Sequence, residues 1–277
     1  MVISSIDIIH ELGKALTPEQ VAIDPMSLEN YGQDWTRFTP PAPKAIVFPR
    51  NTAEVVAIVE CARRCRFALV PSGGRTGLSG GACAANGEVV VSMDKINAIA
   101  PVNLTDRTVT VGAGAITQNV QQAASDAGLF YPVDFASSGS SQIGGNIATN
   151  AGGINVIRYG MTRDWVAGLT VVTGKGEILE LNKGLMKNNT GLDFRHLFIG
   201  SEGILGFITE ATLKLTSPPK DPTVLVLGLS DMNAIMSVLG TAQAADHPLA
   251  TVVSTLNNPF FVTMKAGAAA HPKELGD

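Results

Sequence analysis

The strongest restriction on the fold comes from a glycine-rich segment that lies between two apolar runs. Five glycines fall in the nine residues 73–81, and the flanking runs 67–70 and 89–91 are typical of buried strands. A loop that only connects two strands is usually much shorter. Glycine has no Cβ and tolerates positive φ, so successive main-chain N–H groups can approach an anion closely. We therefore expect this loop to hold a phosphate group, unless it is a surface loop without a ligand.

The loop has hydroxyl groups but no lysine. Ser72, Thr76 and Ser79 can each donate a hydrogen bond, whereas the Gly-Lys-Ser/Thr ending of a Walker loop is absent. Chemistry at a γ-phosphate is therefore not expected. A dinucleotide diphosphate is esterified on both sides, so it needs main-chain donors around it rather than a catalytic lysine.

A second cluster of small residues, SGSSQIGGNIATNAGG, occupies residues 138–153. Two such loops, far apart in the chain and both between core strands, fit one extended ligand that is held from two sides. Asn146, Thr149 and Asn150 add uncharged hydrogen-bonding groups that suit a ribose or the edge of a heteroaromatic ring. The alternative interpretation is turn chemistry without a ligand.

Hydrophobic periodicity predicts a mixed α+β fold. An N-terminal amphipathic helix is expected within 1–16, and residues 17–44 look irregular. A helix at 52–65, capped by Asn51 with Glu54 as its capping-box partner, and a helix at 115–128 are predicted. A hairpin turn is expected at Lys175-Gly176. After the proline-rich segment 217–222 we expect one strand at 223–229 and one helix capped by Ser230. The remaining strands are predicted at 45–48, 67–71, 88–93, 107–114, 166–174, 177–181 and 206–215.

One segment imitates a Rossmann nucleotide site. It has a strand, Gly112-x-Gly114, a helix, and Asp134 twenty residues further on. The third glycine of the G-x-G-x-x-G fingerprint is replaced by Thr117, which would crowd the helix against the strand. We therefore interpret the two glycines as a turn.

Composition excludes several function classes. The net charge of −4 argues against nucleic acid as a partner. No apolar run approaches the ~20 residues of a membrane span. The N-terminal stretch carries Asp7 and Glu11, which is not typical of a secretory signal, so a cytoplasmic location is expected. Cys61, Cys65 and Cys83 lack a second Cys/His pair, so packed thiols are expected rather than a metal site. No acid–base or nucleophile pattern stands out, which suggests that a bound cofactor carries the chemistry.

Four motifs in this order resemble the FAD-binding domain of the p-cresol methylhydroxylase/vanillyl-alcohol oxidase superfamily. They are VPSGGRTGLSGG (70–81), GSSQIGGNIATNAGG (139–153), RYGMTRDWVAGLTVV (158–172) and LFIGSEGILGFITEATLKL (197–215). The most similar group is that of D-lactate dehydrogenases, D-2-hydroxyglutarate dehydrogenases and the FAD subunit of glycolate oxidase. The resemblance covers about residues 30–217.

The resemblance implies a domain organisation. It predicts an FAD-binding domain at 1–217 with two α+β subdomains, about 30–98 and 99–217. Residues 218–277 would then be the start of an incomplete cap domain.

The resemblance also implies a set of FAD-binding residues. Arg75 stands where some relatives carry a histidine that tethers the flavin, so noncovalent FAD is expected. The diphosphate would be held by residues of the first loop: Pro71, Ser72, Gly73, Gly74, Arg75, Thr76, Gly77, Leu78, Ser79 and Gly80. The flavin side would be lined by Pro132, Asp134, Ser138 and Gly139, and the ribityl and isoalloxazine region would be held by Gly144, Gly145, Asn146, Thr149, Asn150 and Gly153. The wall beside the adenosine or the flavin would include Gly203 and Ile208.

The activity implied by the resemblance is oxidation of a small 2-hydroxy acid by hydride transfer to flavin N5. Electrons would pass to a quinone, cytochrome or flavoprotein, which allows attachment at the inner membrane. A partner subunit or a homodimer is left open, and no catalytic base is assigned. Relatives continue well beyond residue 217, so the alternative is an FAD-binding fragment or subunit without turnover of its own.

Overall fold

The computed structural model of the 277-residue chain describes residues 5–220 and 231–244. The chain separates into two compact units, 1–225 and 226–277, and each is described by itself. The domain boundary expected at 217–218 stays a prediction.

The first sheet is built mainly from parallel strands. Its strands are β1 (Val21–Ala22), β2 (Ala45–Val47), β3 (Leu69–Ser72) and β4 (Val89–Ser92), in the order β1-β2-β4-β3. Strands β2, β4 and β3 run parallel, and β1 is antiparallel to β2. Because Ser72 pairs with Ser92, β3 and β4 end at the same edge of the sheet. The glycine-rich loop and the segment after β4 therefore leave from one edge, where open α/β sheets commonly bind ligands.

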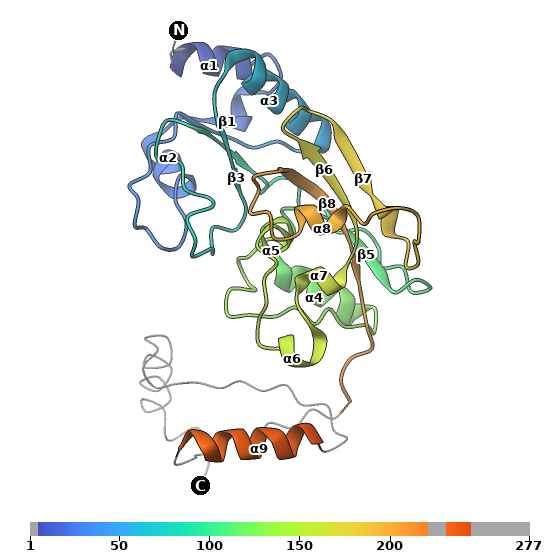
Figure 1. Cartoon of the computed structure of the whole chain (residues 1–277). Helices are drawn as coiled ribbons and strands as arrows, with labels where there is room; N and C mark the ends of the chain where they lie inside the picture. Colours follow the sequence, from blue (N-terminus) through green and yellow to red (C-terminus); the bar gives the residue numbers. More distant parts are fainter. Residues whose placement is uncertain (1–4, 221–230, 245–277) are drawn as a thin grey trace. The chain divides into compact units, whose positions relative to one another are not determined.

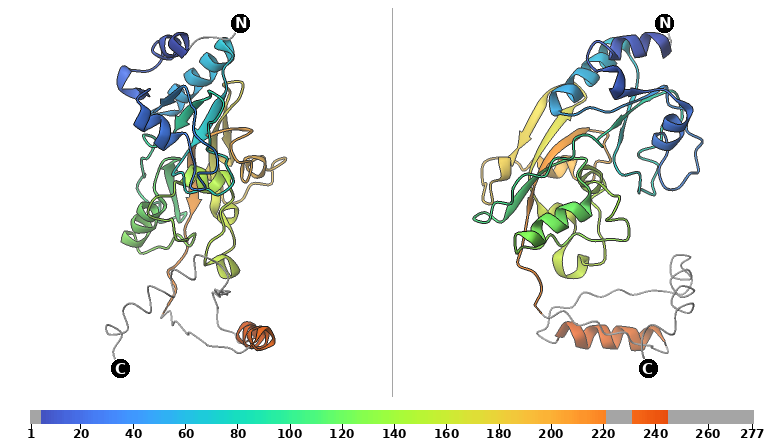
Figure 2. Two further views of the ribbon diagram at one scale, coloured as in Figure 1. Left: turned by 90° about the vertical axis from the view of Figure 1, so that its left-hand side faces the viewer. Right: turned by 180° about the vertical axis from the view of Figure 1, so that it is seen from behind.

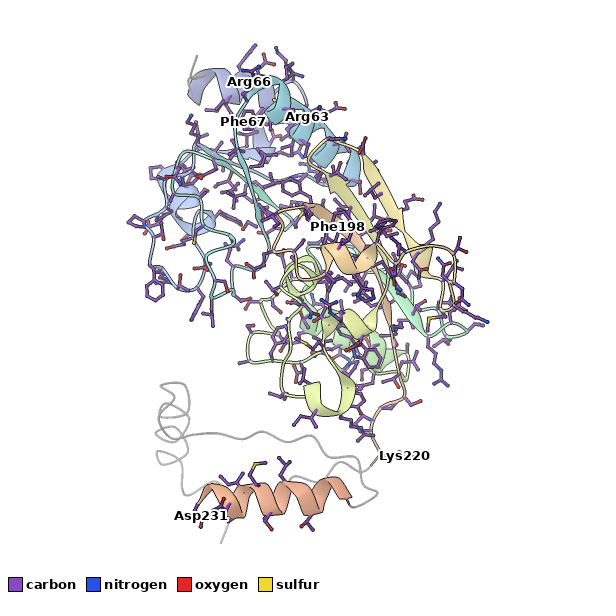
Figure 3. The ribbon with its side chains drawn as sticks, in the orientation of Figure 1. Arg63, Arg66, Phe67, Phe198, Lys220 and Asp231 are labelled. Carbon is purple, nitrogen blue, oxygen red and sulfur yellow. The ribbon has the colours of Figure 1, made fainter. Side chains whose placement is uncertain are left out.

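Helix α3 (Thr52–Cys65) connects β2 to β3 and buries Val55, Ile58 and Val59. The predicted cap is confirmed, because Asn51 Oδ1 accepts a 2.9 Å hydrogen bond from the Glu54 amide. The Glu54 carboxylate accepts from the Arg50 amide at 2.7 Å. The helix ends where Arg66 adopts a left-handed conformation (Figure 3).

The second sheet is antiparallel throughout. Its strands are β5 (Thr108–Gly112), β6 (Val166–Thr173), β7 (Ile178–Leu181) and β8 (Gly206–Lys214), in the order β5-β8-β6-β7. The expected hairpin between β6 and β7 is confirmed, with Gly176 at φ +84° in its turn.

Short helices complete this unit. Figures 1 and 2 show α1 next to α3, where Arg64 forms a 2.9 Å ion pair with Glu11. In Figure 1, α5 lies close to β5 and β8. The helices other than α3 are α1 (Ser5–Leu12), η1 (Pro18–Gln20), α2 (Pro25–Tyr31), α4 (Thr117–Asp126), α5 (Ile143–Ala148), α6 (Val156–Tyr159), α7 (Thr162–Trp165), η2 (Asn182–Gly184) and α8 (Arg195–Phe198).

Two segments expected to be irregular contain helices. Residues 17–44 include η1, β1 and α2, and the small-residue cluster at 138–153, which was expected to be a loop, includes α5. Helix α2 begins at Pro25 because Asp24 Oδ1 accepts a 2.9 Å hydrogen bond from the Ser27 amide. Proline at the first helical position is a start signal rather than a break.

The second unit contains one described element, α9 (Met232–Ala244). Asp231 Oδ1 accepts a 2.9 Å hydrogen bond from the Ala234 amide, so Asp231 caps this helix. Ser230, which the sequence predicted as the cap, lies outside the described residues. The strand expected at 223–229 lies outside the described residues.

One hydrophobic core extends across both sheets. It includes Val91 of β4, Val111 of β5, Ile147 of α5 and Val171 of β6, and Phe198 of α8 packs into it at 7% exposure (Figure 3). A shared core holds the loops of the two sheets at fixed relative positions. The predicted α+β fold class is confirmed, whereas the subdomain bounds at 30–98 and 99–217 stay predictions. Among the described residues, no helix has both the length and the apolar character that a bilayer crossing requires.

Candidate functional site

The two glycine-rich loops touch each other. A Cβ built on Gly74 would lie 2.2 Å from the carbonyl oxygen of Ser140 and 2.9 Å from Cα of Ser141. A Cβ on Gly73 would lie 3.7 Å from Cα of Gly145. Only glycine permits this approach at residue 74, because a Cβ would overlap the facing backbone. The convergence expected from the sequence is therefore present.

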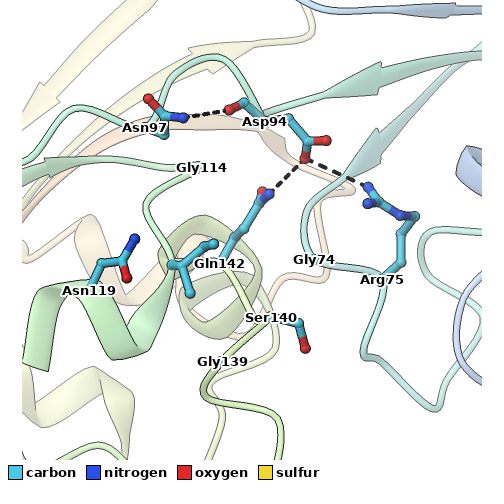
Figure 4. A pocket seen from close by; sticks show the side chains of 10 residues that line it. Gly74, Arg75, Asp94, Asn97, Gly114, Asn119, Gly139, Ser140 and Gln142 are labelled. Atoms are coloured by element: carbon cyan, nitrogen blue, oxygen red, sulfur yellow. Dashed lines mark hydrogen bonds and ion pairs between the residues drawn. The ribbon is translucent and has the colours of Figure 1, made fainter.

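A pocket of about 600 Å³ opens at this contact (Figure 4). Of the residues predicted from the sequence, Gly74, Arg75 and Gly139 line it. The others are mainly uncharged polar groups: Asp94, Asn97, Gly114, Ile116, Asn119, Ser140 and Gln142.

Main-chain donors in the first loop are available to a ligand. Within the described residues, the N–H groups of 73–79 have no hydrogen-bond acceptor, and neither has the N–H of Gly145 in the second loop. Residues 73–76 are half-buried, where main-chain N–H groups normally find partners, and residues 77–79 are exposed. A run of free donors next to a facing loop is the arrangement that a diphosphate requires. The residues present therefore fit an FAD diphosphate.

Among the residues predicted to hold the diphosphate, Gly80 differs because its main-chain N–H has a protein acceptor. Its N–H donates to Asp34 Oδ2 at 2.7 Å, so that amide is already used. Asp34 is only 3% exposed. Burial alone would raise the pKa of this carboxyl, but hydrogen bonds from Thr36 and the Gly80 amide hold its pKa below the usual value. The Trp35 amide also donates to the Gly77 carbonyl at 3.2 Å, so residues 34–36 fasten the far side of the loop.

Other predicted residues of the first loop differ in exposure. Leu78 is 70% exposed, and Ser79 is exposed as well. Ser72 is buried, and its hydroxyl has no hydrogen-bond partner in the described structure. Gly203 reaches the start of this loop, because a Cβ there would lie 2.4 Å from Cγ of Pro71.

Three residues predicted on the flavin side contact the rest of the protein through their main-chain carbonyl groups. Pro132 accepts a 3.0 Å hydrogen bond from Asn155 through its carbonyl. A Cβ on Gly153 would lie 2.1 Å from the Asp134 carbonyl oxygen, and Gly153 has φ +119°. The Ser138 carbonyl accepts from the Gln118 amide at 3.0 Å.

Several polar side chains of the second loop already have protein partners. Asn146 is buried and donates to Thr117 Oγ1 at 2.7 Å. Thr149 Oγ1 donates to the Gly145 carbonyl at 3.0 Å, and Asn150 Oδ1 accepts from the Arg163 amide at 3.0 Å. Their contacts with FAD stay predictions.

Gly144 and Ile208 lie within the packed structure. A Cβ on Gly144 would be 2.7 Å from the Ala113 side chain, so this glycine allows α5 to approach β5. Ile208 belongs to the hydrophobic core of β8 and is 7% exposed. Ile208 as part of a cofactor wall stays a prediction.

The Gly-x-Gly at 112–114 has a packing role. A Cβ on Gly112 would lie 2.2 Å from the Ile96 carbonyl oxygen, and one on Gly114 would lie 1.9 Å from the Met93 carbonyl oxygen. Strand β5 pairs antiparallel with β8, whereas a Rossmann site needs a parallel sheet. These glycines do not form a dinucleotide fingerprint; Gly114 lies in a turn, as interpreted, whereas Gly112 is the last residue of β5.

Sequence reasoning missed the polar residues that follow β4. Asp94 and Asn97 line the pocket because β4 ends at the same edge as β3. A polar side chain directly after a buried strand was the available signal. Outside the pocket, Arg163 Nη1 lies 3.3 Å from His196 Nδ1. No group of three or more metal-ligating side chains gathers in the described part of the chain.

Several curated proteins are similar to this chain in sequence. The chain is 59% identical over 236 residues to a D-2-hydroxyglutarate dehydrogenase of Stutzerimonas stutzeri, a match that covers 85% of this chain and 51% of the relative. It is 37% identical to the glycolate oxidase subunit GlcD of Bacillus subtilis, over 80% of this chain and 50% of the relative. A D-lactate dehydrogenase of Anaerostipes hadrus is also 37% identical, over 77% and 45%. The chain thus spans about half the length of the curated relatives it matches.

Solved structures agree on the fold. An alkyldihydroxyacetonephosphate synthase superposes with a TM-score of 0.70 at 24% identity, covering 79% of this chain and 41% of that one. A 4-ethylphenol oxidase from Gulosibacter chungangensis superposes with a TM-score of 0.66 at 20% identity, over 78% and 43%. The model of the FAD binding domain family matches residues 43–182, which include both glycine-rich loops and the pocket between them. On this match and the convergence of those loops, the chain belongs to the FAD-binding domain family.

Proposed function

We propose that this chain binds FAD noncovalently and forms the flavin-binding part of an enzyme that oxidises a small 2-hydroxy acid. The observation that carries the proposal is the run of free main-chain donors at 73–79, which faces the free N–H of Gly145. The names of the similar proteins support the substrate class, because 2-hydroxyglutarate, glycolate and lactate are all 2-hydroxy acids.

Main-chain amides and uncharged side chains of the pocket would have different roles in binding FAD. The amides of 73–79 would hold the diphosphate oxygens, and the uncharged side chains of Asn97 and Asn119 present hydrogen-bonding groups within the pocket. The chemistry that a bound FAD supplies is acceptance of a hydride, which together with loss of the hydroxyl proton to a base converts a 2-hydroxy acid to its 2-keto acid. No described residue is assigned as that base.

The remaining parts of the proposal concern partners and location. Electrons would pass to a quinone, cytochrome or flavoprotein, and a partner subunit or a second copy of the chain would complete the assembly. A quinone acceptor would place the protein at the inner membrane on its cytoplasmic side. Residues 218–277 would begin a substrate-binding cap.

A second candidate is an FAD-binding fragment or subunit that has no turnover of its own. The observation in its favour is that the chain spans about half the length of its curated relatives. Both candidates require FAD, and they differ in whether substrate reduces it.

One experiment tests both candidates. The purified chain is reconstituted with FAD, its 350–500 nm absorption is recorded, and D-2-hydroxyglutarate, D-lactate or glycolate is added without oxygen. Bleaching supports the oxidising enzyme, and a yellow protein that does not bleach supports the fragment. A protein that stays colourless after reconstitution contradicts both.

A further inference from the structure

The carboxylate of Asp94 contacts three segments that are distant in the sequence. Its Oδ2 accepts a 2.9 Å hydrogen bond from the Tyr31 hydroxyl, and its Oδ1 accepts a 2.7 Å hydrogen bond from Gln142 Nε2. Arg75 Nη1 lies 3.7 Å from the same Oδ1 (Figure 4). Tyr31 ends α2, Arg75 lies in the first glycine-rich loop and Gln142 lies in the second. One side chain therefore joins both loops of the proposed flavin site.

Arg75 is held in a conformation that needs support. Its φ of +57° is rare for a residue with a Cβ. Its guanidinium carbon lies 4.2 Å from the centroid of the Tyr31 ring, and Nη1 donates to the Gly73 carbonyl at 2.8 Å. With Asp94, these contacts stabilise the bend of the loop at the point where its free amides begin.

Asp94 also determines how Gln142 is oriented. A carboxylate only accepts hydrogen bonds, so Gln142 must present its amide nitrogen to Asp94. Its Oε1 is then turned away and lies 3.5 Å from where a Cβ on Gly73 would be. Within the described structure this buried oxygen has no hydrogen-bond donor. The orientation thus places an acceptor against the first loop, next to the contact between Gly73 and Gly145.

The charge of Asp94 makes its pairing with Arg75 necessary. A carboxylate beside a diphosphate is unfavourable unless a cation is near it. Asp94 and Arg75 side chains are 22% and 24% exposed, so water screens the pair only in part. The pair leaves this side of the pocket without net charge while keeping both loops connected.

We propose that Asp94 is a positioning residue of the flavin site, which sets the spacing of the two glycine-rich loops through Arg75 and Gln142. This inference rests on the proposed FAD binding and adds to it a residue that does not itself have to touch the cofactor.

The test compares Asp94→Ala and Asp94→Asn with a matched control, Asp126→Asn. Asp126 also accepts a 2.7 Å hydrogen bond from a glutamine amide, that of Gln122, but it does so on the exposed surface of α4. For each apoprotein we would measure the FAD dissociation constant from the quenching of flavin fluorescence, the visible circular dichroism of the bound flavin, and the melting temperature without FAD.

We expect Asp94→Ala to weaken FAD binding at least 30-fold and to change the visible circular dichroism. Asp94→Asn, which keeps an acceptor for Gln142 but loses the charge that faces Arg75, should weaken binding 3- to 10-fold. Asp126→Asn should bind as the wild type does. Arg75→Ala should have a smaller effect on affinity in the Asp94→Ala background than in the wild type, because the two residues act together.

Two results would overturn the inference while the proposed function stands. The first is unchanged FAD affinity in both Asp94 variants. The second is a lower melting temperature of the apoprotein with unchanged affinity and circular dichroism, which would make Asp94 purely structural. If Asp94→Ala does not fold, Asp94→Asn and the Arg75 comparison decide the question. Failure of the wild-type chain to bind FAD would overturn the proposed function itself.

Discussion

The main-chain N–H of Gly80 donates a 2.7 Å hydrogen bond to the buried carboxylate of Asp34. Because of this bond the Gly80 amide is not available to a ligand, and the C-terminal end of the first glycine-rich loop is held in place by Asp34. Because Asp34 precedes the residues that match the family model, the loop depends on a segment outside that match.

Replacing Asp34 should destabilise the fold. Asp34→Ala leaves the Gly80 amide and the Thr36 amide without their acceptor, which should cost about 1–3 kcal/mol of unfolding free energy. Urea denaturation of the apoprotein measures this. Asp126→Asn, on the exposed surface of α4, should be neutral. Equal stability of wild type and Asp34→Ala would contradict the anchoring role.

The stabilisation by Asp34 should depend on pH. Its pKa in the folded chain is held below the usual value of 3.8, so its ionised form is favoured by folding. The contribution is complete above the unfolded pKa and is lost as the pH falls through the folded pKa. The difference in melting temperature between wild type and Asp34→Asn should therefore be largest near pH 7 and should shrink below pH 4. A difference that grows on acidification would contradict this assignment.

Gly74→Ala should separate the two loops. The added methyl group would lie 2.2 Å from the Ser140 carbonyl oxygen, so one backbone must move. We expect FAD affinity to fall at least tenfold, or about 1.4 kcal/mol. The matched control is Gly174→Ala in the β6–β7 turn, where a Cβ meets nothing within 4 Å. Fluorescence titration with FAD measures both variants, and equal affinities would show that the close contact does not shape the site.

Gly114→Ala should act mainly on stability. A Cβ there would lie 1.9 Å from the Met93 carbonyl oxygen, and overpacking of this kind typically costs about 1–3 kcal/mol. Thermal unfolding of the apoprotein, again with Gly174→Ala as control, measures the effect. A wild-type melting temperature would mean that the backbone at Met93 moves aside easily.

The flavin should leave the protein on acid precipitation. Arg75 occupies the position at which some relatives tether flavin, and a guanidinium stays protonated and is not a nucleophile at working pH. After treatment with trichloroacetic acid, we expect the yellow colour in the supernatant and a colourless pellet. Colour that stays with the pellet after washing would reveal a covalent bond.

The sequence predicted the elements whose signals are local. Asn51 before an apolar stripe predicted α3, Lys175-Gly176 predicted the hairpin, and alternating residues predicted β5. The sequence could propose the two glycine-rich loops as the candidate FAD site because glycine is needed where a backbone comes very close to another group. Helix α2 was not predicted because none of its residues is fully buried, so it lacks a strong apolar stripe; Asp24 directly before Pro25 was the available start signal.

The pairing of distant residues was decided only by the tertiary structure. Nothing in the local sequence connects Asp94 with Gln142, or Asp34 with Gly80, because these contacts depend on how β3 and β4 end at one edge and on the core that both sheets share. The sequence determined which backbone segments can approach a ligand, since that depends on the absence of a Cβ. The fold determined which of their amides stay free, since that depends on the partners that packing brings to them.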